Sequence, residues 1–374
     1  MSATLEEHVG YISDAVRMEQ FRQAIAQAIR PGDVVVDLGC GFAPLGLMCL
    51  QAGAARVYGI DSTEAIEIAR ESAARAGFAD RYHCISNSSF RTELPELADV
   101  VICDHVGYFG FDYGVIQIIG DARRRMLKPG GKVLPQRLSL RMAGINSAAC
   151  RDKAFAWTAS AMPEAYRWLE DYCLNTKHTH CYAANEVLTN ESTIGDIDLG
   201  IDQPDHLQFA GELIALSDGE MDGLGGWFDC TISGQVHMTN SPLDPGRIRR
   251  DQVFLPFARP LPVNKGDSVA VTLGFRHDNS LIAWTAHNRA SNQKRRHTTW
   301  ASMILSEADR HGAAEAPARL GNLGAASRAL LSLIDGKRTT REIADQFVSL
   351  HPDLFPGEAE IRKWIQGELA RYTR

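Results

Sequence analysis

Two acidic residues lie on either side of a glycine-rich turn near the start of the chain, and their spacing suits a nucleoside ligand. Asp37 lies at the end of the apolar run VVVD, Gly39 and Gly41 follow it, and Asp61 ends the next apolar run, RVYGID. A glycine turn after a strand lets the backbone approach a ligand, and an acid at the end of the second strand can bind two ribose hydroxyls. We therefore expect these four residues to bind a nucleoside cofactor.

The turn also discriminates between cofactors. In DLGCGFAP, Pro44 occupies the position of the third glycine of a dinucleotide-binding turn, so a pyrophosphate fits less well. S-adenosylmethionine has no phosphate but carries a ribose and a charged amino-acid end, and Asp37 before the turn suits it. We take S-adenosylmethionine as the first candidate and a dinucleotide as the second. A structural interpretation stays open, in which Asp37 caps a helix and the glycines serve the turn alone.

The segments around the turn alternate between strand and helix patterns. Strand patterns cover residues 34–38, 56–61, 82–86 and 98–103, and helical patterns cover residues 6–29, 45–52, 64–76 and 116–126. This alternation predicts an α/β domain with a doubly wound, Rossmann-like parallel sheet. LKPGGKVLP is typical of a turn followed by a strand, and Pro135 marks a plausible domain edge. Residues 1–135 are thus the predicted cofactor domain.

The pattern changes after Pro135. Residues 136–311 hold a helical stretch around residues 151–173 and then short alternating strands separated by turn residues, which favours an antiparallel sandwich or barrel. We take this segment as an antiparallel β-barrel substrate domain. Residues 312–326 are typical of a linker. Residues 327–374 return to helical patterns and predict a small helical, winged-helix-like module.

Composition limits the partners of the chain. Its formal net charge of −7 disfavours broad binding to nucleic acid or to an anionic membrane. The eight cysteines are scattered without a CxxC pair, so we expect reduced thiols and no metal site. The N-terminus lacks the apolar run of a signal peptide, and we expect a cytoplasmic protein.

Several ordered motifs together resemble the protein arginine methyltransferase family, a class I S-adenosylmethionine-dependent group. His8, Asp14 and Arg17 match the N-terminal H-x-x-M-L-x-D-x-x-R pattern, and the glycine turn and LKPGGKVLP match later motifs. The resemblance implies that Arg17 pairs with the cofactor carboxylate, that the turn lies near the methionine part and that Asp61 binds the ribose. It also implies a head-to-tail homodimer formed through the helical stretch around residues 151–173.

The acceptor loop departs from the family pattern S-E-W-M-G-Y with a second Glu a few residues on. Here the loop reads CDHVGYFGFDYG, so Asp104 replaces the first Glu and Tyr113 stands at the second, with Asp112 beside it. Two carboxylates can clamp a planar guanidinium, whereas one carboxylate holds it less well. A guanidine, an amine or an imidazole could bind here. The expected acceptor-side residues are Asp104, His105, Tyr108 and Tyr113.

The family's T-H-W element also departs, since RRHTTWAS has Thr299 in place of the His, retains Trp300 and carries His297 two residues earlier. Asp112 and His297 are the candidates to replace the missing side chains. The last helical segments weakly resemble the peptide-chaperone fold of the pyrroloquinoline quinone pathway. A winged helix or a simple packing appendage is an equal alternative for them.

Together these features predict an S-adenosylmethionine-dependent N-methyltransferase that acts on a peptide or protein side chain, with arginine as the first candidate. One alternative is an N-methyltransferase for a small metabolite, such as free arginine or another amino-nitrogen compound. Another is a catalytically weak binding or scaffold protein that retains the cofactor fold.

Overall fold

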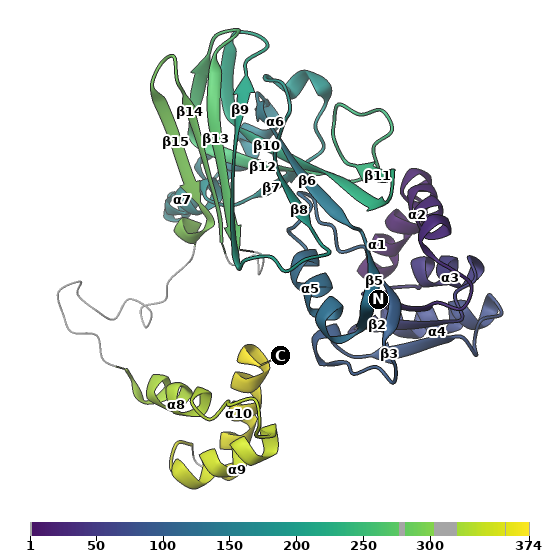
Figure 1. Cartoon of the computed structure of the whole chain (residues 1–374). Helices are drawn as coiled ribbons and strands as arrows, with labels where there is room; N and C mark the ends of the chain where they lie inside the picture. Colours follow the sequence, from purple (N-terminus) through teal and green to yellow (C-terminus); the bar gives the residue numbers. More distant parts are fainter. Residues whose placement is uncertain (1, 277–280, 303–319, 356, 374) are drawn as a thin grey trace. The chain divides into compact units, whose positions relative to one another are not determined.

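The computed structural model describes residues 2–276, 281–302, 320–355 and 357–373. The chain divides into two compact units, Met1–Ile304 and Leu305–Arg374 (Figure 1). The first unit holds a parallel sheet and antiparallel sheets, and the second holds helices.

The parallel sheet of the first unit has the strand order β3-β2-β1-β4-β5. Its strands are β1 Val34–Leu38, β2 Arg56–Asp61, β3 Tyr82–Ser86, β4 Ala98–Cys103 and β5 Leu127–Leu134. All five residues of β1 are buried, because the sheet is covered on both faces. The predicted Rossmann-like sheet is confirmed, although LKPGG already belongs to β5 and is not a separate turn.

Helices surround this sheet. They are α1 Ser2–Ile12, α2 Ala15–Ala28, α3 Pro44–Gln51, α4 Ala65–Arg75 and α5 Val115–Arg125. The single helical pattern predicted over residues 6–29 is divided in the structure, because Asp14 caps a new helix by accepting a hydrogen bond from the Arg17 N–H at 3.2 Å. The break places Arg17 in the first turn of α2.

The antiparallel part of the first unit contains two sheets. One has the order β7-β12-β10-β6-β8 with β11 paired to β10, and the other has the order β15-β14-β13-β9. The strands are β6 Arg137–Ile145, β7 His178–His180, β8 Ser192–Asp198, β9 His206–Ile214, β10 Gly219–Ser233, β11 Val236–Thr239, β12 Gln252–Val263, β13 Ser268–Arg276, β14 Ile282–Asn288 and β15 Gln293–Thr298. Buried side chains such as Trp227 and Trp284 fill the core. The predicted antiparallel strands are confirmed, and they share one compact unit with the parallel sheet.

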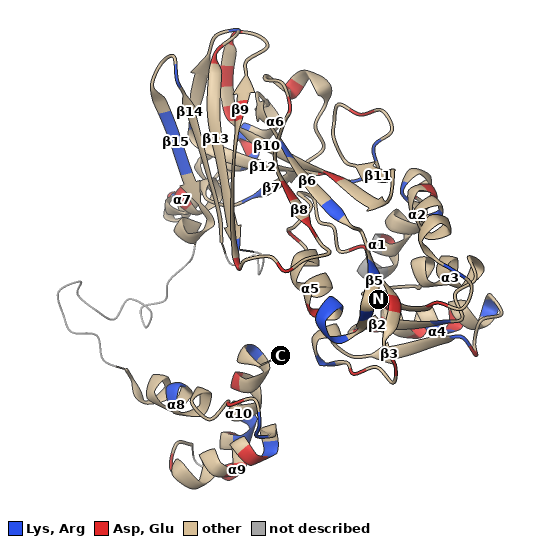
Figure 2. Cartoon of the chain, in the orientation of Figure 1, with Lys and Arg blue, Asp and Glu red and all other residues tan. Residues whose placement is uncertain are grey.

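Charged contacts and ring stacking join the two parts of the first unit. Lys and Arg gather at the carboxyl end of α5 (Figure 2), where Arg124 contacts Asp202, beyond the end of β8, at 2.9 Å. The rings of Phe111 and Phe275 stack with centroids 3.6 Å apart, which fixes the loop after β4 against β13.

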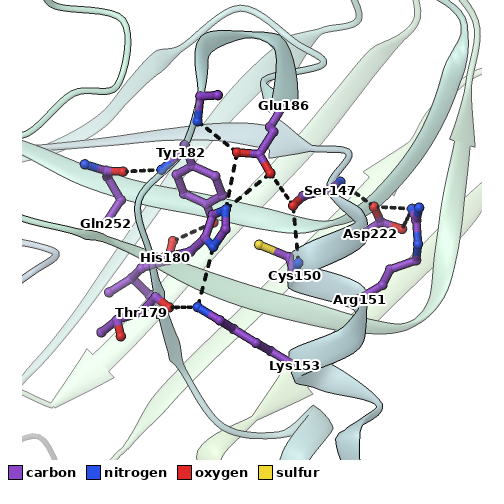
Figure 3. Close-up of polar contacts among 12 residues, drawn as sticks. Ser147, Cys150, Arg151, Lys153, Thr179, His180, Tyr182, Glu186, Asp222 and Gln252 are labelled. Atoms are coloured by element: carbon purple, nitrogen blue, oxygen red, sulfur yellow. Dashed lines mark hydrogen bonds and ion pairs between the residues drawn. The ribbon is translucent and has the colours of Figure 1, made fainter. Parts of the chain in front are cut away.

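The helical stretch predicted around residues 151–173 is a series of short segments. They are α6 Ala148–Ala154, 3-10 turns at Ala156–Thr158 and Glu164–Leu169, and α7 Glu170–Leu174. A polar cluster fixes the start of α6 (Figure 3). Buried Asp222 accepts hydrogen bonds from the Ser147 N–H at 2.7 Å and from Arg151, and Glu186 contacts Ser147 and His180. The segment is therefore anchored at its start while Tyr166 and Trp168 are exposed.

The second unit consists of α8 Asn322–Leu331, α9 Thr340–Leu350 and α10 Glu358–Tyr372. Leu330, Phe347 and Ile361 form the centre of its core, and Thr339 with Glu342 makes a capping box at the start of α9. The helical module agrees with the sequence pattern, and its resemblance to a peptide chaperone stays a prediction. Among the described residues, no helix combines the length and apolar character needed to cross a membrane.

Candidate active site

A cavity of about 390 Å³ opens at the carboxyl ends of β1, β2 and β4. Such ends are where open parallel sheets bind ligands. Its lining includes Arg17, Asp37, Gly39, Gly41, Asp61, Asp104, His105 and Tyr113. The structure thus brings together eight of the nine residues expected to bind the cofactor or the acceptor, and Tyr108 is the ninth. A larger groove of about 930 Å³ follows β5 and the barrel, but none of these nine residues lines it.

Asp37 is buried beneath the glycine turn. One of its oxygens, Oδ2, accepts hydrogen bonds from the Gly46 N–H at 2.9 Å and from the Tyr82 hydroxyl at 3.3 Å. Burial raises the pKa of Asp37 to about 7, although both hydrogen bonds oppose the rise. Because Gly46 lies in the first turn of α3, the side chain caps that helix while it lines the cavity floor.

The turn requires glycines because two histidine rings lie very close to its backbone. Gly39 and Gly41 have φ values of +60° and +53°, and a Cβ on Gly39 would lie 1.8 Å from Cε1 of His105. A Cβ on Gly41 would lie 2.5 Å from Nε2 of His8. The turn therefore leaves room for two imidazole rings from distant segments, and both rings line the cavity.

Asp61 is fixed in orientation at the end of β2. Its Oδ2 accepts a hydrogen bond from the Gly41 N–H at 3.0 Å, and its Oδ1 accepts from the Thr63 N–H at 2.8 Å and the Thr63 hydroxyl at 2.6 Å. Carboxylate oxygens have further lone pairs, so Asp61 can still accept hydrogen bonds from a diol in the cavity.

Arg17 and Asp104, which both line the cavity, form an ion pair. Their side chains are only 6 % and 8 % exposed. Nη1 of Arg17 also donates to the Tyr11 carbonyl at 3.1 Å, and the guanidinium carbon lies 5.1 Å from the Tyr11 ring centroid. Burial and, secondly, the charge of Arg250 lower the pKa of Arg17 to about 10. Two charges that the sequence assigned to different ligands thus neutralise each other.

The remaining acceptor-loop residues present neutral groups. Nδ1 of His105 lies 3.5 Å from the Cys103 sulfur, and burial lowers the pKa of His105, which keeps the imidazole uncharged near neutral pH. Tyr113 lines the cavity, and burial raises its pKa. Tyr108 lies outside the cavity lining and packs edge-on against Tyr113 with ring centroids 5.5 Å apart.

Neither Asp112 nor His297, the candidates to replace the missing family residues, lines the cavity. Asp112 is buried, accepts a hydrogen bond from the Phe109 N–H and pairs with Lys177 at 2.6 Å, outside the cavity lining. His297 is buried in the barrel, where its Nε2 accepts from the Ala258 N–H at 3.2 Å. Both residues were candidates because of their positions in the sequence, but in the structure Asp112 pairs with Lys177 and His297 contacts Ala258.

The barrel segment that contacts the site lies at residues 248–250, not at RRHTTWAS. The Arg249 N–H donates to Oδ2 of Asp14 at 2.6 Å, and Nη1 of Arg250 donates to the Val106 carbonyl in the acceptor loop. RRHTTWAS lies in β15 of the other antiparallel sheet and in the 3-10 turn that follows it, and none of its residues lines the cavity. Sequence reasoning missed Arg250, since RIRRD matches no motif that it used.

No group of three or more His, Cys, Asp or Glu side chains in the described ranges is arranged to hold a metal ion. All eight cysteines are free thiols. The cavity lining presents carboxylates, a guanidinium, imidazoles and phenols.

The sequence is similar to methyltransferases. Residues 35–131 match the family described as "Methyltransferase domain". The chain is 28% identical over 236 residues to a probable protein arginine N-methyltransferase 6 of Arabidopsis thaliana, covering 61% of this chain and about half, 54%, of that relative. It is 28% identical over 298 residues to the protein arginine N-methyltransferase PRMT10 of Oryza sativa subsp. japonica, covering 70% of this chain and 78% of the relative.

Solved structures show the same fold. The PRMT1 enzyme-prozyme heterotetrameric complex of Trypanosoma brucei with AdoHcy contains a chain that superimposes with a TM-score of 0.69 at 20% identity, over 78% of this chain and 96% of that one. Protein arginine methyltransferase 10 of Arabidopsis thaliana superimposes with a TM-score of 0.68 at 20% identity, over 79% of this chain and 98% of that one.

Proposed function

We propose that this protein is an S-adenosylmethionine-dependent N-methyltransferase, because it carries a methyltransferase domain and has the fold of the protein arginine methyltransferases. Its acceptor is a peptide or protein side chain, with arginine as the first candidate. The observation that carries the proposal is the single cavity in which Asp61 and Asp104 lie at the ends of β2 and β4. One acid suits a ribose and the other suits a cationic acceptor.

The residues of the cavity fit the cofactor. Asp61 would bind the ribose hydroxyls, the tight turn at Gly39 and Gly41 would lie against the amino-acid part, and Arg17 would pair with the carboxylate. The AdoHcy complex of the trypanosomal neighbour supports this choice. When bound, S-adenosylmethionine supplies an electrophilic methyl group.

Asp104 is the acceptor-side carboxylate in this proposal. A guanidinium is planar and delocalised, so a carboxylate beside it can fix its orientation and localise its charge on one side. Asp104 can then take up the proton that the acceptor nitrogen loses on methylation, and the Tyr113 hydroxyl can orient the same group. Positioning supplies much of the rate, since methyl transfer needs an aligned lone pair.

Self-association is part of the proposal. The segment from α6 to α7 exposes Tyr166 by 52 % and Trp168 by 58 %, and α1 exposes Val9 by 63 % and Ile12 by 43 %. Exposed aromatic residues on an anchored segment favour an interface. We propose that the segment of one copy packs against α1 of a second, and that the protein is cytoplasmic, consistent with its free thiols.

The test is incubation of the purified full chain with labelled S-adenosylmethionine and separate pools of proteins, arginine peptides and free amino acids. We expect label in the arginine peptides or proteins. Label confined to free amino acids would favour the metabolite alternative. Calorimetry with S-adenosylhomocysteine is the parallel measurement, because tight binding without transfer to any pool would identify a scaffold.

A further inference from the structure

Arg250 contacts two elements that form the cavity. Its Nη1 donates to the Val106 carbonyl in the acceptor loop, and its guanidinium carbon lies 5.2 Å from the ring centroid of Tyr11, which lines the cavity. Within the described chain its Nη2 is buried and has no hydrogen-bond partner. A buried charged donor without an acceptor is unfavourable, so a ligand group that reached Nη2 would gain the full strength of a charge-assisted bond.

The two carboxylates of the acceptor loop pair with cations other than Arg250. Arg17 and Arg250 lie close enough that the charge of Arg250 contributes to the lowered pKa of Arg17. Among the described residues of the loop, Asp104 is the carboxylate that lines the cavity and it pairs with Arg17, whereas Asp112 pairs with Lys177. The guanidinium of Arg250 is therefore not paired with a carboxylate of this loop.

Resting on the proposed function, we propose that Arg250 binds a carboxylate that the methyl acceptor carries close to its reacting nitrogen. Nη1 donates to the Val106 carbonyl, so Nη2 is the donor that is left without an acceptor, and Arg250 lies next to the cavity lining through its contact with Tyr11. The carboxylate can come from free arginine itself or from an acidic side chain next to an arginine in a peptide. In both cases Asp104 binds the guanidinium end and Arg250 binds the acidic end of one acceptor.

The experiment measures acceptor binding to the full chain saturated with S-adenosylhomocysteine. One pair of probes is arginine and agmatine, which differ in the carboxylate alone, and a second pair is an arginine peptide with Glu or Gln beside the arginine. In at least one pair we expect the carboxylate to tighten binding about tenfold, equivalent to about 1.4 kcal/mol. Arg250→Gln abolishes that difference. Arg250→Lys retains part of it, and Arg249→Gln, the neighbouring control of equal charge, retains all of it.

Equal affinities within both probe pairs for the parent protein overturn the inference, and this comparison needs no variant to fold. No binding by any of the four probes overturns it as well. A carboxylate preference that persists in Arg250→Gln assigns the site to another residue and also overturns it.

Methyl transfer measured with the same probes separates this inference from the proposed function. Transfer to arginine or to the peptides without a carboxylate preference removes only the role of Arg250. Carboxylate binding that depends on Arg250, without transfer to any probe, supports the Arg250 site and counts against the methyltransferase assignment.

Discussion

Replacing Asp104 with Asn removes one charge of the buried pair that lines the cavity. The change leaves Arg17, whose side chain is 6 % exposed, without its carboxylate partner. Breaking a buried pair from one side costs about 3–5 kcal/mol of folding stability. The Tyr11 carbonyl at 3.1 Å and the rings of Tyr11 and Phe21 still contact the guanidinium, so we expect a loss near the low end, about 3 kcal/mol.

The same substitution should affect cofactor binding and turnover in different ways. In the parent, a cofactor carboxylate must compete with Asp104 for Arg17, whereas in Asp104→Asn it meets an unpaired guanidinium. We therefore expect the variant to bind S-adenosylhomocysteine at least as tightly as the parent and to be stabilised more by it. Turnover should fall about ten- to a hundredfold, because a charged hydrogen bond of about 1.5–3 kcal/mol to the acceptor is lost.

The assay combines denaturant unfolding, calorimetry with S-adenosylhomocysteine and turnover on one identified acceptor. Asp112→Asn is the matched control, because it breaks the buried pair with Lys177 outside the cavity lining and should lower stability without a selective loss of turnover. Unchanged turnover in Asp104→Asn would refute the acceptor role. A fall in cofactor affinity equal to the fall in turnover would show that Asp104 is structural.

The pKa of Asp37 is about 7 in the folded chain, against an ordinary value of 3.8, so the folded state favours the protonated carboxyl. The stability that this preference contributes is fully present below about pH 4 and is lost as the pH rises through about 7, by up to roughly 4 kcal/mol. Asp37→Asn should flatten this profile, and denaturant unfolding at about pH 5 and about pH 8 measures it; an unchanged slope contradicts the assignment. Asp61→Ala should weaken S-adenosylhomocysteine binding about tenfold or more in calorimetry, and parent-like affinity would exclude a ribose contact. Tyr113→Phe should reduce turnover less than about tenfold, since a neutral hydroxyl cannot balance charge, and a loss as large as that of Asp104→Asn would argue against this. Light scattering at micromolar concentration should show a dimer that Trp168→Ser weakens, and a monomeric parent would remove the interface.

The parallel sheet and the glycine turn could be predicted because their signals are local. Three valines before Asp37 fit a strand buried on both faces, and the strand ends place Asp61 and Asp104 at the same edge without further information. The loss of a second acidic residue at Tyr113 was likewise visible in the loop sequence. Tyr113 does line the cavity, as its position in that loop predicted.

What the sequence did not reveal depends on contacts between distant segments. Arg250 reaches the Val106 carbonyl across the boundary between the sheet and the barrel, and nothing in RIRRD indicates this. Asp112 is adjacent to Tyr113 in the chain, yet Lys177 holds its carboxylate away from the cavity. The letters around Trp300 resembled a family motif, but a short match carries no information about which sheet the segment joins.

The mutual pairing of Arg17 and Asp104 was also hidden from sequence reasoning. Each residue was predicted to face a ligand, and each lines the cavity, but in the structure they contact each other. Two opposite charges buried at one site lower their joint desolvation cost by pairing. Their relation is thus a property of the folded site and not of either motif.

The measurement that tests the central claim most directly is the position of the new methyl group on an arginine peptide, read by tandem mass spectrometry after incubation with the purified full chain and S-adenosylmethionine. The same reaction is run with Asp104→Asn. We predict methylation of a guanidinium nitrogen by the parent and about ten- to a hundredfold less product from the variant. A methyl group on a carboxylate oxygen or a thiol sulfur, or equal product from Asp104→Asn, would contradict the account.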